Sequence, residues 1–305
     1  MPAPPDLQVT IGGGRKGDPL VLRAPVIAAA GTFGTASELS RLVDYTRLGA
    51  IVTPATGRSA RAGARRIVEV AAGVLVALPY PVIAVRTVER RLAPLWVACG
   101  TAVIVNVSAE DPDEAVEVVT RLDRLSGISG FELAFSLLSA AAQPAVIEFV
   151  QEVVSRVAAA CSLPVIVKLR AEAAAVRRLA RAAEAAGADA LCLCGAPRGQ
   201  PVDLARRQID GERDYLLCGP AVKPLTLRLL EHASGAVNVP LIASGGIATG
   251  QDAVECLLAG ADAVQVGSAT FAHANATSEV AAGIAAYVAT HGDPTSATAR
   301  TSARG

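Results

Sequence analysis

Residues 240–268 read PLIASGGIATGQDAVECLLAGADAVQVGS, and they contain one complete structural unit. The stretch begins with a short apolar run, Pro240–Ser244, continues with a segment of helical period, Gln251–Ala259, and ends with a second apolar run, Ala263–Gly267. A strand, a helix and a second strand in this order predict a βαβ unit with parallel strands. Both runs are apolar almost throughout, which is typical of strands that are covered on both faces.

The same pattern precedes this stretch along the chain. Further strands are expected at Pro25–Ala30, Ala50–Thr53, Ala102–Val107, Phe131–Ala134, Pro164–Leu169 and Ala190–Cys194. Further helices are expected at Pro112–Leu125, Pro144–Ala160, Ala171–Ala186, Val222–Ser234 and Ser278–His291. Eight strands with intervening helices over roughly 250 residues predict an α/β fold of the TIM (β/α)8 barrel type. A doubly wound sheet usually has fewer strands and a reversal point, so it fits less well.

The two ends of the chain differ from the repeat. Leu7–Ile11 and Leu20–Arg23 flank three consecutive glycines, Gly12–Gly14, which predicts a short N-terminal β-hairpin capping the bottom of the barrel. No boundary follows the hairpin, so residues 1–291 are expected to form a single barrel domain. Residues 292–305 are rich in Thr, Ser, Ala and Arg without periodicity, which predicts a disordered C-terminal tail.

Composition excludes several classes of protein. The chain has 305 residues, of which 52% are hydrophobic, so it can bury a substantial core and is not intrinsically disordered as a whole. Lys plus Arg and Asp plus Glu both total 28, so no excess of positive charge favours binding to nucleic acid or to an anionic membrane. The six scattered cysteines form neither a zinc-site pattern nor a disulfide framework, and no metal is expected.

Neither a membrane span nor a secretion signal is expected. The longest apolar stretch, Val74–Val85, is interrupted by Pro79 and Pro81 and is shorter than the roughly 20 residues that a spanning helix needs. The start, Met1-Pro-Ala-Pro-Pro, has neither a cationic nor an apolar region of the kind found in signal peptides. The sequence therefore predicts a cytoplasmic protein that acts on a small-molecule substrate.

Glycines follow the seventh and eighth expected strands. Gly245 and Gly246 end the first of these runs, and Gly267 and Ser268 end the second. In a TIM barrel these two loops commonly form a phosphate site, because glycine lets backbone N–H groups approach the anion. The alternative is a pair of tight turns that need glycine only for their backbone conformation.

Lys168 closes the apolar run Val165–Lys168, at the end of a strand where barrel enzymes place their active-site residues. Only three of the 28 basic residues are lysines, which sets this position apart. We expect Lys168 to face a ligand. The alternative is a rim lysine that extends its ammonium group into solvent.

Several motifs occur in the order and spacing of a known family. They are Leu22-Arg-Ala-Pro-Val-Ile-Ala-Ala-Ala-Gly-Thr-Phe-Gly34, Leu48-Gly-Ala-Ile51, Asn106-Val107, Glu132-Leu133, Pro164-Val-Ile-Val-Lys168 and Gly219-Pro-Ala-Val-Lys-Pro224, with the two glycine-bearing turns. Over about residues 7 to 290 the chain resembles the class 1 dihydroorotate dehydrogenases. That resemblance implies an FMN-binding TIM barrel that oxidises dihydroorotate to orotate in pyrimidine biosynthesis.

The resemblance also implies which residues bind the cofactor. It places the flavin ring against Ala30 and Gly31 and near Thr56, with Asn106 and Lys168 at the polar atoms of the ring or the ribityl chain. The residues implied for the ribityl end and the phosphate are Gly219, Gly245, Gly246, Gly267 and Ser268. Relatives form homodimers, and one branch pairs with an iron–sulfur/FAD subunit, so a homodimer and an electron-transfer subunit are the partners implied.

The substrate side departs from the family. The family motif N-x-S-C-P-N supplies a cysteine base, but this chain reads Ala134-Phe-Ser-Leu-Leu-Ser139, with Leu137 at the base position. The lysine of K-A-T-T is replaced by Pro54, the segment L-N-A-I-G-L-Q-N-P by residues 75–83, and the N-T pair by Cys194-Gly195. The catalytic residue is therefore unknown, and the remaining candidates are Ser136, Ser139 and Cys194.

Three functions remain open from the sequence. The first is an FMN-dependent oxidoreductase that oxidises dihydroorotate or a related cyclic substrate by hydride transfer to flavin N5. The second is a catalytically silent barrel that acts as a binding or regulatory subunit. The third is a flavin-free TIM-barrel enzyme that uses the glycine-bearing turns to bind a phosphorylated metabolite.

Overall fold

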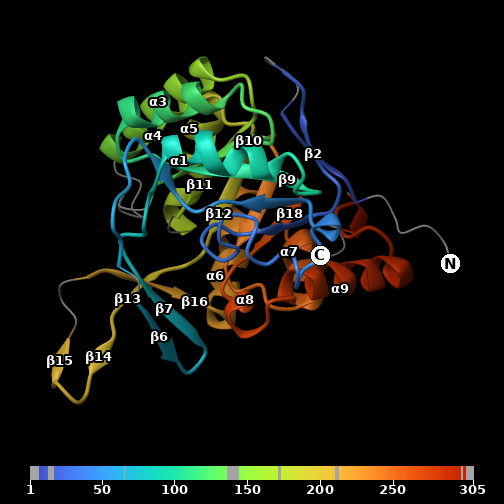
Figure 1. Ribbon diagram of the computed structural model, residues 1–305. Helices are drawn as coiled ribbons and strands as arrows, with labels where there is room; N and C mark the ends of the chain where they lie inside the picture. The colour runs from blue at the N-terminus through green and yellow to red at the C-terminus, as the bar shows by residue number, and fades with distance from the viewer. Residues whose placement is uncertain are drawn as a thin grey trace.

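A closed barrel of parallel strands forms the centre of the protein. The computed structural model describes residues 7–12, 17–64, 66–135, 144–170, 173–209, 213–296 and 298–299 (Figure 1). The barrel strands, in spatial order, are β3 (Val26–Ala28), β4 (Ala50–Val52), β9 (Ala102–Ser108), β10 (Gly130–Ala134), β11 (Val165–Leu169), β12 (Ala190–Cys194), β17 (Leu241–Ser244) and β18 (Ala263–Val266). The ring closes where β18 pairs in parallel with β3, with Val264 opposite Val26. All eight predicted strands are confirmed.

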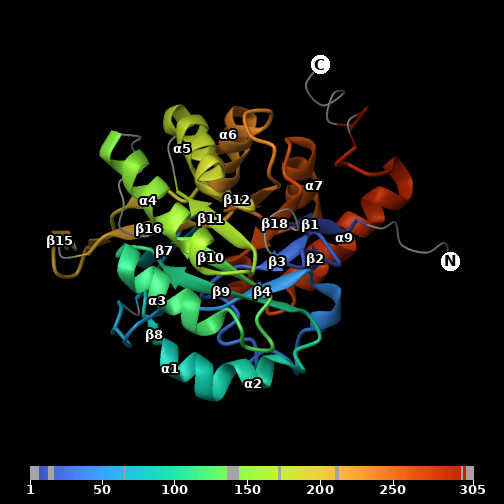
Figure 2. The ribbon, with the colours of Figure 1, turned by 90° about the horizontal axis from the view of Figure 1, so that it is seen from above.

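Helices surround the strands (Figure 2). The predicted ones are α3 (Pro112–Leu122), α4 (Pro144–Ala160), α5 (Ala173–Ala186), α6 (Lys223–Ala233), α7 (Gly250–Leu258) and α9 (Ala276–His291). Local side chains cap the start of two of these helices. The Asp111 side chain accepts a hydrogen bond from the backbone N–H of Glu114 at the start of α3. Thr249 and Asp252 form a reciprocal capping box at the start of α7.

The alternation of side chains along each strand divides the core into two parts. Outward-facing residues such as Val105, Leu133 and Val167 pack against the helices in one large cluster. Inward-facing residues such as Ile104 and Ile166 fill the barrel in a second cluster. The antiparallel pair β1 (Val9–Ile11) and β2 (Leu20–Leu22) contributes Ile11, Leu20 and Leu22 to that inner cluster. The predicted hairpin is therefore present and plugs one end of the barrel.

An antiparallel sheet that the sequence analysis did not predict projects from the barrel (Figure 1). Its strands, in spatial order, are β13 (Arg198–Gly199), β16 (Tyr215–Cys218), β7 (Gly73–Ala77) and β6 (Ile67–Val70). The further elements are β5 (Thr56–Gly57), β8 (Ile83–Ala84), the hairpin β14 (Val202–Asp203) and β15 (Gln208–Ile209), the continuous helical run α1 (Val85–Thr87), η2 (Val88–Leu92) and α2 (Ala93–Trp96), the single turn α8 (Ala269–Ala272), and the 3-10 turns η1 (Tyr45–Arg47) and η3 (Pro220–Val222). The long apolar stretch of the sequence therefore contains β7 and β8.

Some expectations concern residues outside the described ranges. These residues include Ser136, Leu137 and Ser139, and the tail beyond residue 299. The single domain over residues 1–291 and the disordered tail stay predictions. All six cysteines lie in described segments and are free thiols. Among the helices in those segments, none combines the length and the apolar character that crossing a membrane requires.

Candidate active site

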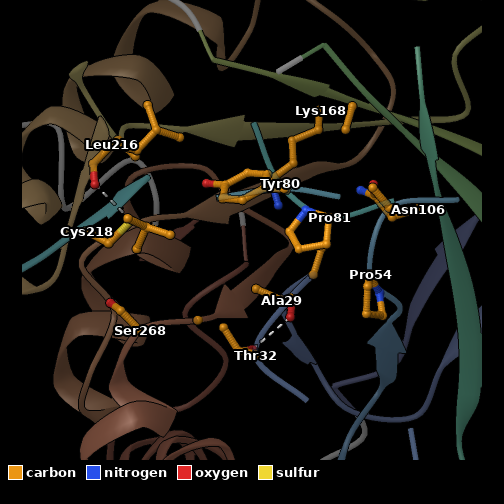
Figure 3. A pocket seen from close by; sticks show the side chains of 18 of the residues that line it. Ala29, Thr32, Pro54, Tyr80, Pro81, Asn106, Lys168, Leu216, Cys218 and Ser268 are labelled. Atoms are coloured by element: carbon orange, nitrogen blue, oxygen red, sulfur yellow. Dashed lines mark hydrogen bonds between the residues drawn. The ribbon is translucent and has the colours of Figure 1, made fainter. Parts of the chain in front are cut away.

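A cavity of about 1050 Å³ lies at the carboxyl ends of the barrel strands (Figure 3). It brings together nine of the ten predicted cofactor residues: Ala30, Gly31, Asn106, Lys168, Gly219, Gly245, Gly246, Gly267 and Ser268. Cys194, one of the three catalytic candidates, also lines it. Thr56 does not line it and is fully buried. Segments from both halves of the sequence therefore meet at one site, as the barrel topology requires.

The alternation of strand side chains places several polar groups at the inner mouth of the barrel. Ile104 and Ile166 point into the barrel. Asn106 and Lys168 each lie two residues further along the same strands, and both line the cavity. Gln265 occupies the corresponding place on β18, two residues after the inward-facing Ala263. The barrel interior is thus apolar toward the N-terminal hairpin and polar at the cavity.

These polar groups form one hydrogen-bonded cluster around Glu132, whose side chain is fully buried. The Glu132 carboxylate accepts hydrogen bonds from Asn106 Nδ2, at 2.8 Å, and from Gln265 Nε2. Lys168 Nζ donates to Gln265 Oε1 at 2.6 Å and lies 3.5 Å from Glu132 Oε1. The carboxylate and the amide oxygen therefore hold the ammonium group in the cavity wall, which excludes the alternative of a rim lysine extended into solvent.

The electrostatic surroundings keep Lys168 charged. Burial, the largest single influence, lowers the pKa of its ammonium group, but Glu132 together with Cys192, Cys194 and Tyr80 raises the pKa by more, so the net shift is upward. An ion pair buried to this degree is held by its hydrogen bonds as well as by its charges. The cavity wall therefore contains a fixed positive charge.

The turns after β17 and β18 present unused hydrogen-bond donors. These strands pair with each other, with Ser244 opposite Gln265, so the turns that follow lie side by side. Within the described part of the chain, the backbone N–H groups of Gly245, Gly246, Gly267 and Ser268 donate no hydrogen bond. Several free backbone N–H groups at one edge of a cavity form a suitable environment for an anion.

The glycines of the two turns are required for different reasons. Gly246 has φ +80°, and a Cβ there would lie 2.2 Å from the backbone nitrogen of Lys223 at the start of α6. The turn and the close approach of the helix therefore already explain this glycine. Gly267 has no positive φ, and an added Cβ would meet nothing closer than Ala29 Cβ, at 3.4 Å. No backbone constraint explains Gly267, and it lines the cavity.

One part of the cavity wall is apolar. The antiparallel sheet contributes Val76 from β7 and Leu216 and Cys218 from β16. Pro54 and Tyr80 come from connecting loops. Arg61 also lines the cavity and is already paired, because its Nη1 lies 2.7 Å from Glu114 Oε1.

Comparison with known proteins decides the family. The model of the family described as dihydroorotate dehydrogenase matches residues 19–288. The chain belongs to the dihydroorotate dehydrogenase family. A relative from Geotalea daltonii, named dihydroorotate dehydrogenase B (NAD(+)), catalytic subunit, is 38% identical over 297 residues, which cover 95% of each chain. A relative of the same name from Pelobacter propionicus is 36% identical over 295 residues, covering 94% of this chain and 95% of that one.

A solved dihydroorotate dehydrogenase has the same fold. The structure from Eimeria tenella, in complex with ferulenol, superposes with a TM-score of 0.77 at 18% identity, covering 98% of this chain and 89% of that one. At this low identity the likeness concerns the fold alone. The predicted resemblance and the predicted barrel with its hairpin are both confirmed.

Three residues of this site were not predicted from the sequence of this dihydroorotate dehydrogenase family member. Glu132 and Gln265 were quoted within motifs, but no role was inferred for them. An acid and an amide inside otherwise apolar strands were the available signal, because buried polar groups need partners. Tyr80 was missed because the sheet that forms its surroundings was not predicted. Its signal was an aromatic residue in a chain with only 3% aromatic content.

Proposed function

We propose that this chain is an FMN-dependent oxidoreductase that acts on a CH–CH bond of dihydroorotate or of a related cyclic compound. Four free backbone N–H groups, in a cavity that also contains the fixed charge of Lys168, are the observation that supports it. These features suit a ligand with a phosphate at one end and a ring that gains negative charge at the other. Membership of a family of flavoproteins supports the same ligand.

The lining residues fit FMN in character. In this proposal Gly245, Gly246, Gly267 and Ser268 bind the phosphate, and Gly219 lies near the ribityl chain. Ala30 and Gly31 lie against the ring, where an added Cβ at Gly31 would meet nothing within 4 Å. When bound, FMN supplies a hydride acceptor at N5. Thr56, which does not line the cavity, is not supported as a ligand of the ring.

Within this proposal Lys168 and Asn106 are the polar side chains that interact with the bound ring. The Lys168 ammonium group stabilises negative charge that develops on the ring as it is reduced. Glu132 and Gln265 fix the position of that ammonium group, and Glu132 also orients the Asn106 amide. The donors are thus positioned before any ligand arrives, which lowers the cost of reorganisation.

The base that removes a proton from the substrate is still unassigned. Ser136 and Ser139 lie outside the described residues, and Cys194 lines the cavity. A missing general base costs about 10² to 10⁴ in rate. Because Leu137 stands at the position of the family's base, we infer that dihydroorotate is turned over slowly.

The partners and the location are also proposals. The two relatives quoted above are catalytic subunits by name, which supports a separate electron-transfer subunit for this chain. A homodimer and a cytoplasmic location are inferred from the family resemblance and the composition.

Flavin content tests the proposed function. The purified protein should absorb at about 370 and 450 nm and release FMN on heating. Gly267→Val should lose most of the flavin, because its methyl groups enter the cavity where no backbone contact prevents it. Ala285→Val, on the exposed face of α9, adds the same kind of side chain outside the cavity and should keep the flavin.

Two results would count against the proposal. A colourless protein that cannot be reconstituted with FMN would refute it, and phosphate binding by such a protein would favour the flavin-free enzyme. Full flavin content in Gly267→Val would instead refute the assignment of the phosphate site.

A further inference from the structure

Tyr80 places an aromatic hydroxyl in the apolar end of the cavity. It lies between β7 and β8, and its hydroxyl points toward Leu216 and Cys218 (Figure 3). Leu78, Ala196 and Leu216 form a small buried cluster, and Tyr80, Cys194 and Cys218 pack against it. The ring is therefore held by side chains from β12, β16 and the loops around them.

The Tyr80 hydroxyl has no partner in the described part of the chain, where no residue forms a hydrogen bond with it. Burial raises the pKa of the Tyr80 phenol, and the thiols of Cys218 and Cys194 raise it further. Arg170 and Lys168 act in the opposite direction without reversing the shift. The phenol is therefore neutral at physiological pH, so it can donate a hydrogen bond but cannot serve as a base.

Two polar side chains of the cavity wall already donate hydrogen bonds within the Glu132 cluster. The Asn106 amide donates to Glu132, and the Lys168 ammonium group donates to Gln265. Val76 also lines the cavity, and neither it nor the cluster of Leu78, Ala196 and Leu216 offers a hydrogen-bonding side chain. A ligand against this apolar cluster meets the hydroxyl of Tyr80 as a free neutral donor, and the charges of Lys168 and Arg170 also act on Tyr80. A ligand with many polar atoms would lose its hydrogen bonds to water without replacement.

We propose that this end of the cavity binds a neutral, largely apolar ring that carries a single carbonyl oxygen, and that Tyr80 donates a hydrogen bond to that oxygen. The inference deepens the proposed function, on which it rests, by naming the substrate class. Dihydroorotate differs from this class, since it carries a carboxylate and several ring amide groups. Arg170 also lines the cavity, so binding of an anion is the competing outcome.

A matched pair of probes tests the proposal. 1-Indanone and indane have the same fused ring system and differ in one carbonyl oxygen. Calorimetric titration of the purified protein should show tighter binding of 1-indanone than of indane. In Tyr80→Phe, the Kd for 1-indanone should rise by about 2-fold to 12-fold, the range that the net contribution of one hydrogen bond sets. The Kd for indane should not change.

Tyr287→Phe provides the control. It removes the same hydroxyl from a ring on α9 that stacks on His291 outside the cavity, so both Kd values should stay at those of the unmodified protein. Equal binding of 1-indanone and indane, or equal effects of Tyr80→Phe on both, would overturn the proposal. So would failure to bind either probe, or tighter binding of orotate than of 1-indanone.

The flavin content of each sample separates this inference from the proposed function. A protein that binds 1-indanone through Tyr80 but holds no flavin would support the ring site and refute FMN. A protein that holds flavin and shows no dependence on Tyr80 would leave the cofactor proposal intact and refute the ring site.

Discussion

Replacing Glu132 by glutamine should destabilise the protein strongly, because it leaves a buried charge without its counter-ion. The Glu132 side chain is fully buried, accepts two hydrogen bonds and lies 3.5 Å from Lys168 Nζ. In Glu132→Gln the new amide oxygen can still accept one hydrogen bond, but the new NH₂ group faces amide donors. Removing one partner of a buried ion pair costs about 3–5 kcal/mol. We expect a loss of this size in the free energy of unfolding at pH 7.

The pH dependence of that loss identifies its cause. In the unmodified protein the pKa of Lys168 is raised, so its stabilising contribution is present below the unfolded pKa and disappears as pH rises through the folded pKa. In Glu132→Gln, burial should lower the pKa of Lys168. Above that lowered pKa the unfolded state binds more protons than the folded state, so stability should rise with pH. The difference between the two proteins should therefore shrink from pH 7 to about pH 9.5.

Urea unfolding followed by circular dichroism measures both effects. Adding Lys168→Met to Glu132→Gln removes the unpaired charge, so the double variant should be more stable than Glu132→Gln alone. Glu231→Gln removes a carboxylate from a solvent-exposed pair with Arg228 and should cause no measurable loss. A loss in Glu132→Gln that is the same at both pH values, or one that Lys168→Met does not relieve, would refute the electrostatic explanation.

Three further predictions concern the cofactor, the substrate and the fold. Lys168→Ala should lower the reduction potential of bound flavin, by about 30 mV for each 1.4 kcal/mol of lost stabilisation, and an unchanged potential in a dye-equilibration titration would exclude this role. Anaerobic mixing of flavin-loaded protein with dihydroorotate should bleach the flavin about 10² to 10⁴ times more slowly than in the Geotalea daltonii relative, and rapid bleaching would mean that a base is present. Gly246→Ala should lower the thermal unfolding temperature, since its Cβ would lie 2.2 Å from the Lys223 nitrogen, and an unchanged temperature would contradict the crowding argument.

The barrel could be predicted because its strands are mostly apolar runs, as Ala50–Val52 and Ala190–Cys194 show. Strands buried on both faces carry this signal without reference to their partners. The antiparallel sheet could not be predicted in this way. Its strands β7 and β16 are joined by long-range pairing, and Tyr215 pairs with Ala77, a residue far away in the sequence. Only the folded chain brings these two strands together, so the apolar wall around Tyr80 could not be inferred.

The same limit applies to the polar cluster. The glycine-bearing turns could be identified by their place after the seventh and eighth strands, and Lys168 by its place at a strand end. Glu132 and Gln265 are 133 positions apart in the sequence, and their hydrogen bond depends on the closed ring. The sequence alone could show that each is a polar residue in an otherwise apolar strand. It could not show that the two side chains form a hydrogen bond with each other.

Ring closure between β3 and β18 has a consequence for the order of events during synthesis on the ribosome. Val26 emerges early, but its partner Val264 emerges only when most of the chain has been made. Until then β3 and β17 each present an unpaired strand edge, and such edges can recruit other chains. Glu132 also stays exposed to water until Gln265, one of its hydrogen-bond donors, has been synthesised. Late translation is therefore the period of greatest exposure to aggregation, and a chain that stops before residue 263 would keep both edges open.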